Sequence, residues 1–132
     1  MSDTGSHSRH YTLEEATALL PRVMELIEIM RVAREQLGDV DARAALAAAG
    51  GSNGGGRPGR TVSRGFLGLR DSMLELRRLD VVLRDLDRGL VDFPALREGR
   101  EVYLCWQEGE SEIGFWHEPG AGFGGRQPLG DG

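Results

Sequence analysis

The stretch Leu76–Pro94, LRRLDVVLRDLDRGLVDFP, contains the point at which the hydrophobic pattern of the chain changes. Before Asp80, apolar residues recur every three or four positions, which is the spacing of an amphipathic helix. After Asp80, short apolar runs alternate with turn residues such as Asp87-Arg88-Gly89, a pattern typical of strands joined by hairpins. The chain therefore joins a helical half to a β half, and we predict an α+β fold.

Two amphipathic patterns form the helical half. The first begins at a capping box of Thr12 and Glu15 and continues as a heptad stripe typical of coiled coils, formed by Ala16, Leu19, Val23, Leu26, Met30, Ala33 and Leu37. Pro21 predicts a short helix to about Leu19 and a restart near Pro21. Beyond Gly38, the alanine-rich residues 41–49 extend the pattern by one or two turns.

The second pattern runs from about residue 61 or 63 to Leu79, with a stripe formed by Val62, Phe66, Leu69, Met73, Leu76 and Leu79. The glycine-rich residues 50–60 between the two patterns are typical of a flexible linker. A phosphate-binding loop is the alternative, but no Gly-Lys-Ser/Thr follows and the chain contains no lysine. We therefore predict a long antiparallel helical hairpin over residues 12–79.

Four short runs rich in β-branched and aromatic residues form the β half: Val81–Leu86, Leu90–Pro94, Val102–Trp106 and Ile113–His117. Because the turns between them are short, the strands are predicted to pair as a small antiparallel β-meander over residues 81–118. Residues 11–119 then make a single α+β domain. Residues 1–10 are predicted to be a disordered N-terminus, and residues 120–132 a glycine-rich tail, part of which can fold back on the sheet.

Composition excludes several classes of protein. The 132 residues carry 16 basic and 21 acidic side chains, a net charge of −5, which argues against binding to nucleic acid or to a membrane surface. The single cysteine, Cys105, excludes an internal disulfide and fits a reducing compartment. With neither a signal peptide nor a membrane-spanning run, we expect a soluble, cytoplasmic protein. Residues 91–132 hold 3 arginines and 8 acids, so a basic or cationic partner is predicted for this acidic half.

Several blocks of the chain resemble a known family. The blocks are, in order, 11–16 (YTLEEA), Leu20-Pro21, 87–94 (DRGLVDFP), 102–106 (VYLCW), 113–117 (IGFWH) and 122–126 (GFGGR). Together they resemble the bacterial domain-of-unknown-function family 2203 over nearly the whole chain, apart from the extreme N-terminus and the linker. That family carries no activity to transfer, so the resemblance implies no catalytic residues. Its members tend to end the second helix at a glycine, where this chain has Leu79-Asp80-Val81.

The polar residues of the β half are the candidates for a ligand-binding site: Asp92, His117, Glu118 and Arg126. Asp92 and His117 are the metal-ligand candidates, yet a metal site needs at least three convergent donors. His117 and Glu118 are adjacent, so they point to opposite faces of a regular strand. We therefore favour a structural role in which His117 bonds a carbonyl or a carboxylate. Cys105 is expected to be a buried, unreactive thiol and Arg126 to pair with a nearby acid, and no cofactor is expected.

Two functions are consistent with these observations. We predict a non-catalytic, self-associating interaction module, because one hairpin and one small sheet leave apolar surface uncovered. The expected homodimer forms through the residues Leu19, Val23, Leu26, Met30, Leu69, Met73 and Leu76. The alternative is a protein or enzyme that binds a divalent metal or small ligand around Asp92, His117 and Glu118.

Overall fold

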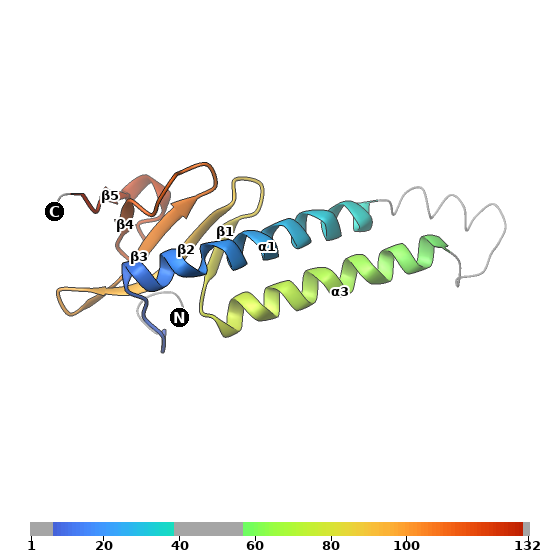
Figure 1. Cartoon of the computed structure of the whole chain (residues 1–132), viewed down its shortest axis with the longest axis horizontal. Coiled ribbons are helices and arrows are strands. Elements are labelled where there is room, and N and C mark those ends of the chain that lie inside the picture. The colour runs from blue at the N-terminus through green and yellow to red at the C-terminus, as the bar shows by residue number, and fades with distance from the viewer. Residues whose placement is uncertain (1–6, 39–56, 131–132) are drawn as a thin grey trace. The chain divides into compact units, whose positions relative to one another are not determined.

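The computed structural model describes residues 7–38 and 57–130, with side chains from Arg64 onward in the second range. Within these residues, two α-helices precede a five-stranded antiparallel sheet (Figure 1), so the predicted α+β fold is confirmed. The chain divides into two compact units. We call Met1–Met24 with Leu76–Gly132 the sheet unit, and Glu25–Glu75 the helical unit. The predicted helical extension 41–49 and most of the linker 50–60 lie outside the described residues.

Helix α1, Leu13–Gly38, begins at the predicted capping box. The Thr12 N–H donates to Glu15 Oε1 at 2.9 Å, and the Glu15 N–H donates to Thr12 Oγ1 at 3.0 Å. The predicted break at Pro21 is wrong, because α1 continues through it. An interior proline removes one backbone hydrogen bond and costs about 3 kcal/mol. Ala16 and Val23, both 0% exposed, lie on either side of Pro21, and their burial offsets that cost.

Helix α3, Arg57–Arg78, begins earlier than the sequence predicts. Its first four residues, 57–60, are the last four of the predicted linker. A proline in the first turn is compatible with this start, because the first N–H groups of a helix have no acceptor within the helix. No helix of the described residues is long and apolar enough to cross a membrane.

Small residues bring α1 and α3 together within the helical unit, where the two helices run antiparallel side by side (Figure 1). A Cβ atom at Gly65 would lie only 3.0 Å from the carbonyl oxygen of Ala33. The predicted stripe on α3 is wrong at Phe66 and Met73, which are 57% and 48% exposed. The buried side carries Gly65 and Ser72 instead, because small side chains allow the backbones to approach closely.

The sheet has the strand order β1-β2-β3-β4-β5, and every neighbouring pair is antiparallel. The strands are β1 (Val82–Asp85), β2 (Leu90–Arg97), β3 (Arg100–Gln107), β4 (Phe115–His117) and β5 (Gln127–Pro128). The first four occupy the predicted positions. β5 was not predicted as a strand: it is the glycine-rich tail folded back beside β4, where the Leu129 N–H donates to the Gly114 carbonyl at 2.8 Å.

The two faces of the sheet differ in chemistry. One face is apolar, and Tyr11 packs its ring edge-on against Phe93 at a centroid distance of 5.5 Å, while its N–H donates to the Pro94 carbonyl. Val91 and Phe93 are both 0% exposed on this face. Asp92 lies between them in β2 and therefore points to the other face. The alternation predicted around Asp92 is thus confirmed.

The helix-to-strand junction is a Schellman motif centred on Asp80. The Asp80 N–H donates to the Arg77 carbonyl and the Val81 N–H to the Leu76 carbonyl, both at 3.0 Å. Asp80 has a φ of 62°, the left-handed conformation in which glycine is the usual residue. An aspartate tolerates this conformation better than most residues, and here its carboxylate also accepts the Arg9 N–H at 3.3 Å.

Gly65 and Gly68 are expected to respond differently to substitution by alanine. An added Cβ at Gly68 would make only ordinary contacts, at 3.6 Å or more. Gly68→Ala is expected to raise the free energy of unfolding by about 0.5–1 kcal/mol through helix propensity. Gly65→Ala carries the same gain but also an overpacking cost of about 1–3 kcal/mol. Urea denaturation of both variants measures the difference, and equal stabilisation by the two substitutions would contradict the packing described.

Candidate functional site

Strand register brings three chemically active side chains to the polar face of the sheet. Asp92 of β2 pairs directly with Cys105 of β3, and Tyr103 of β3 pairs with His117 of β4. Asp92, Cys105 and His117 are each 1% exposed. One ligand atom from each of the three lies within 4.8 Å of the others. The sequence identified Asp92 and His117 as candidates, and Cys105 joins them through the β2–β3 register.

The ring of His117 is held at both nitrogens. Nε2 lies 2.9 Å from Asp92 Oδ2, and Nδ1 lies 2.8 Å from the carbonyl oxygen of Glu118. A carbonyl only accepts, so Nδ1 carries a hydrogen. An ionised carboxylate also only accepts, so a second proton on Nε2 makes the ring an imidazolium. Burial lowers the pKa of His117, but the hydrogen bonds to Asp92 and to the Glu118 carbonyl, together with the negative charge of Asp92, raise it by more, so the net shift is upward.

Arg84 supplies the second positive charge beside Asp92. Its Nε donates to Asp92 Oδ2 at 2.7 Å, and its guanidinium carbon lies 5.1 Å from the centre of the Tyr103 ring. Oδ2 therefore accepts from two donors, whereas the buried Oδ1 has no hydrogen-bond partner within the described chain. The carboxylate is thus satisfied on one oxygen only.

The thiol of Cys105 completes the cluster. Burial, followed by the negative charge of Asp92, raises its pKa to about 12. A thiol with this pKa stays protonated near neutral pH, and the thiolate is the nucleophilic form. The burial predicted for Cys105 is therefore confirmed, and its lack of reactivity remains a prediction.

The N-terminal segment lies against the same polar face. His7 Nε2 is 2.7 Å from the Tyr103 hydroxyl, and His7 Nδ1 is 3.4 Å from Asp80 Oδ1. His10 Nε2 is 2.8 Å from Glu101 Oε2. The prediction that residues 1–10 form a disordered terminus is therefore wrong for residues 7–10, and residues 1–6 lie outside the described chain. Sequence reasoning missed these histidines because their partners follow at least 70 residues later.

Two of the predicted site residues are engaged elsewhere. The carboxylate of Glu118 accepts from Arg100 at 2.7 and 2.9 Å near the surface, so only its backbone carbonyl reaches His117. Arg126 pairs with Glu110 at 2.6 Å and lies 3.9 Å from the centre of the Phe115 ring. The predicted pairing of Arg126 with an acid of the C-terminal third is confirmed, and the side chains of Glu118 and Arg126 pair elsewhere than with Asp92 and His117.

Internal pairing also uses much of the acidic charge of the β half. The acids that hold a cationic or histidine partner within the chain are Asp92, Glu101, Glu110 and Glu118. The basic or cationic partner remains a prediction, and the pairing leaves fewer acids for it to meet.

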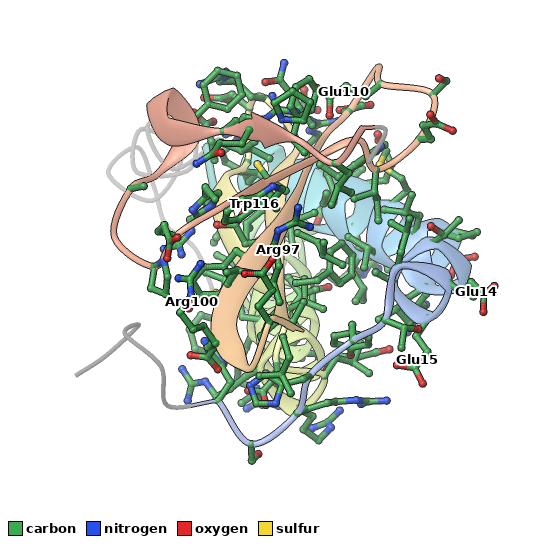
Figure 2. All side chains as sticks on the ribbon, turned by 90° about the vertical axis from the view of Figure 1, so that its left-hand side faces the viewer. Glu14, Glu15, Arg97, Arg100, Glu110 and Trp116 are labelled. Carbon is green, nitrogen blue, oxygen red and sulfur yellow. The ribbon has the colours of Figure 1, made fainter. Side chains whose placement is uncertain are left out.

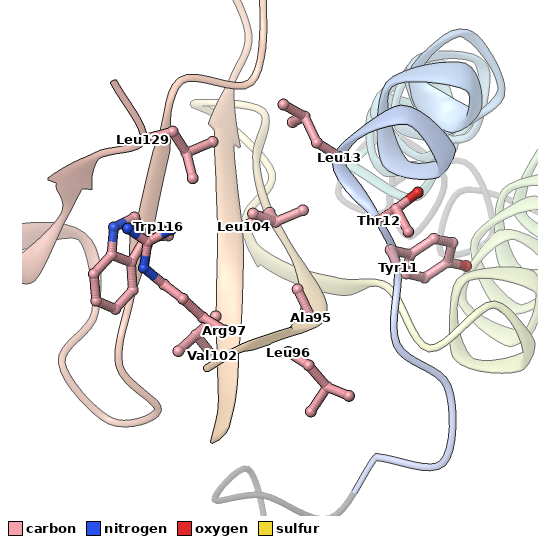
Figure 3. A pocket seen from close by; sticks show the side chains of 10 residues that line it. All are labelled: Tyr11, Thr12, Leu13, Ala95, Leu96, Arg97, Val102, Leu104, Trp116 and Leu129. Atoms are coloured by element: carbon pink, nitrogen blue, oxygen red, sulfur yellow. The ribbon is translucent and has the colours of Figure 1, made fainter. Parts of the chain in front are cut away.

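A cavity of about 180 Å³ opens on the apolar face, between the start of α1 and the sheet (Figure 3). Trp116 and Leu104 line it, so their neighbours His117 and Cys105 point away from it. Arg97 is the charged residue that lines the cavity, and its guanidinium carbon lies 4.5 Å from the centre of the Trp116 ring (Figure 2). Asp92 and His117 converge with each other but do not line this cavity.

Most of the predicted self-association residues are inside the chain's own core. Val23, Leu26, Met30 and Leu76 are 0–3% exposed, and Leu19 and Leu69 are half-buried. Met73 is the exposed member of that set. Most of the predicted stripe is therefore buried within the chain, and self-association through it remains a prediction.

Loss of the Asp92 carboxylate is expected to destabilise the fold strongly. Asp92→Ala leaves His117 and Arg84 without their shared partner, and breaking a buried ion pair costs about 3–5 kcal/mol. Glu118→Ala is the matched control, because it removes a carboxylate from an exposed pair and is expected to change stability far less. Urea denaturation at pH 7 compares the two variants. Similar losses of stability in both would contradict the expected contribution of the buried ion pair.

The raised pKa of His117 predicts a pH dependence of stability. Because its folded-state pKa lies above the ordinary 6.5, the contribution of the imidazolium is complete below pH 6.5 and is lost as the pH rises through the folded-state pKa. With a chelator present, the free energy of unfolding of wild type is expected to fall as the pH rises above 6.5, relative to that of His117→Gln. Urea titrations across this range measure the loss, and an NMR titration of the His117 ring checks it without a variant. Parallel stability curves together with an unshifted ring pKa would contradict the assignment.

Comparison with known proteins gives one family. A model of DUF2203, described as an uncharacterized conserved protein, matches residues 9–129. No curated protein and no solved structure matches the chain. The match covers both helices and all five strands, including the residues of the buried cluster, so the chain belongs to the DUF2203 family.

Proposed function

We propose that this protein is a non-catalytic interaction module that forms a homodimer through the helical unit. The observation that carries the proposal is a set of large apolar side chains exposed on that unit. These side chains are 39–57% exposed and are Ile29, Val32, Phe66, Leu67, Met73 and Leu74. Exposed apolar side chains that gather in one place commonly mark an interaction site, and of these six Ile29 and Val32 line the same groove.

The contact surface is a shallow groove along α1 and α3 within the helical unit. The groove has a volume of about 460 Å³ and is lined by Glu28, Ile29, Val32, Ala33, Gln36, Arg64 and Gly68. Ala33 has a small side chain and Gly68 has none, so the surface is hollowed beside Ile29 and Val32. A side chain from another helix fits a hollow of this type in helix packing.

A second copy of the chain is the partner that the groove favours. Homodimers use the same patch on both subunits, so the patch must be complementary to itself. The groove carries an acid, Glu28, and a base, Arg64, beside its apolar residues, so a two-fold arrangement can bring opposite charges together. Burying Val32 and Ile29 from each copy is worth about 1.5–3 kcal/mol per side chain at most. The loss of translational and rotational freedom opposes this gain, so we expect a weak dimer.

Val32→Asp tests the proposal, because it places a charge in the centre of the groove at a site already 54% exposed. Light scattering during size exclusion at high micromolar concentration is expected to give twice the chain mass of 14.4 kDa for wild type and the monomer mass for the variant. Thr17→Asp is the matched control: it adds the same charge to an exposed position of α1 outside the groove, and it is expected to remain dimeric.

A wild-type mass of 14.4 kDa at high micromolar concentration would overturn the proposed function. A dimer that persists in Val32→Asp would instead place the interface elsewhere on the chain. Circular dichroism of both variants shows whether they keep their helices.

A further inference from the structure

We propose that the buried cluster of Asp92, Cys105 and His117 is a binding site for one Zn²⁺ ion. Three side chains that converge from three neighbouring strands offer one oxygen, one sulfur and one nitrogen within 4.8 Å of one another. Zinc is bound by this combination of carboxylate, thiolate and imidazole ligands. This site is separate from the helical unit and does not depend on the proposed dimer.

The orientation of the His117 ring fits a metal ligand. Nδ1 lies 2.8 Å from the Glu118 carbonyl and is thereby fixed as a donor. A metal-bound histidine commonly donates its other ring N–H to a carbonyl or carboxylate in this way. The lone pair of Nε2 in the neutral ring then points at Asp92 Oδ2, 2.9 Å away. In that ring, Nε2 is therefore the nitrogen available to a metal ion held beside the Asp92 carboxylate.

Asp92 Oδ1 supplies an independent sign of a missing ligand. This oxygen is buried and has no hydrogen-bond partner in the described chain, and an unsatisfied buried acceptor is costly. Arg84 already donates to Oδ2 at 2.7 Å, so Oδ1 is the oxygen that remains for a metal. The thiol of Cys105, the residue paired with Asp92 across β2 and β3, is the third donor.

The distances require only small movements. Tetrahedral zinc, with bonds of about 2.0–2.3 Å, separates its ligand atoms by about 3.3–3.8 Å. The three atoms now lie within 4.8 Å of one another, so binding requires them to close by about an ångström. Charge also balances: a carboxylate and a thiolate neutralise Zn²⁺, and the protons of the thiol and of His117 Nε2 leave to solvent as the ion binds. Arg84, with 31% of its side chain exposed, marks the side from which the cluster reaches the surface.

Metal titration of the untagged full-length chain, after chelator treatment, tests the site. Zn²⁺ is expected to bind with a stoichiometry of one and to raise the melting temperature. Co²⁺ is expected to give visible bands of tetrahedral coordination and a thiolate-to-cobalt charge-transfer band. Cys105→Ser is expected to lose the charge-transfer band, and both Cys105→Ser and His117→Asn are expected to bind Zn²⁺ at least about tenfold more weakly, the loss typical of disturbing a metal site.

The double variant His7→Asn/His10→Asn is the matched control, because it removes two histidines from the same face but outside the cluster. Unchanged binding in this control supports the proposal. Loss of binding in the control, with retention in Cys105→Ser and His117→Asn, would place the metal on the N-terminal histidines and overturn it. The cobalt spectrum of wild type needs no variant to fold: if it lacks the thiolate band, or if Zn²⁺ does not bind, the proposed site is wrong.

Discussion

The buried carboxylate of Asp92 is the constraint on which the sheet unit depends. An ionised group that is 1% exposed needs compensation from its neighbours, and here the compensation comes from two other strands: Arg84 of β1 and His117 of β4 both contact Oδ2. Their contacts hold only in one register, since a slip of one residue would turn Asp92 into the apolar face beside Tyr11. The pair therefore ties the order of β1, β2 and β4 to a single alignment, in a sheet whose remaining core residues are mostly apolar.

The two faces of this sheet stabilise the sheet unit in different ways. The apolar face, with Phe93 and Trp116, packs against the segment that leads into α1 and provides hydrophobic stabilisation. The opposite face holds a polar layer in which His7 contacts Tyr103 and Asp80, so that the N-terminal segment is fixed by hydrogen bonds. Asp80 serves both structures, because its backbone ends α3 and its carboxylate holds the N-terminal segment. A glycine at this position would end the helix equally well but could not make the second contact.

The helical unit is stabilised by close packing of its two helices. Close approach of α1 and α3 depends on Gly65, and large apolar side chains such as Val32 and Phe66 lie outside the contact. The unit thus buries large residues such as Leu26, Ile27 and Met30 of α1 and small ones such as Gly65 of α3, and it presents other large residues to the outside.

The amino-acid sequence by itself determined the elements and the side of each strand residue. The change from a period of three to four to short alternating runs predicted the helices and the first four strands, and alternation placed Asp92 opposite Val91 and Phe93. It also separated His117 from Glu118. These are local properties, because a side chain's direction along a strand follows from the backbone alone.

Tertiary structure decided which of these residues meet. On α3, the side that contains Gly65 is buried, whereas the predicted stripe that contains Phe66 is partly exposed. Packing of Gly65 against Ala33 determines which side faces α1. α1 continues through Pro21 because burial on both sides offsets the lost hydrogen bond. Strand register places Cys105 beside Asp92 and His117, and His7 contacts Tyr103, which lies nearly a hundred residues later in the chain. Periodicity carries no information on such contacts, since they depend on how distant segments are aligned in space.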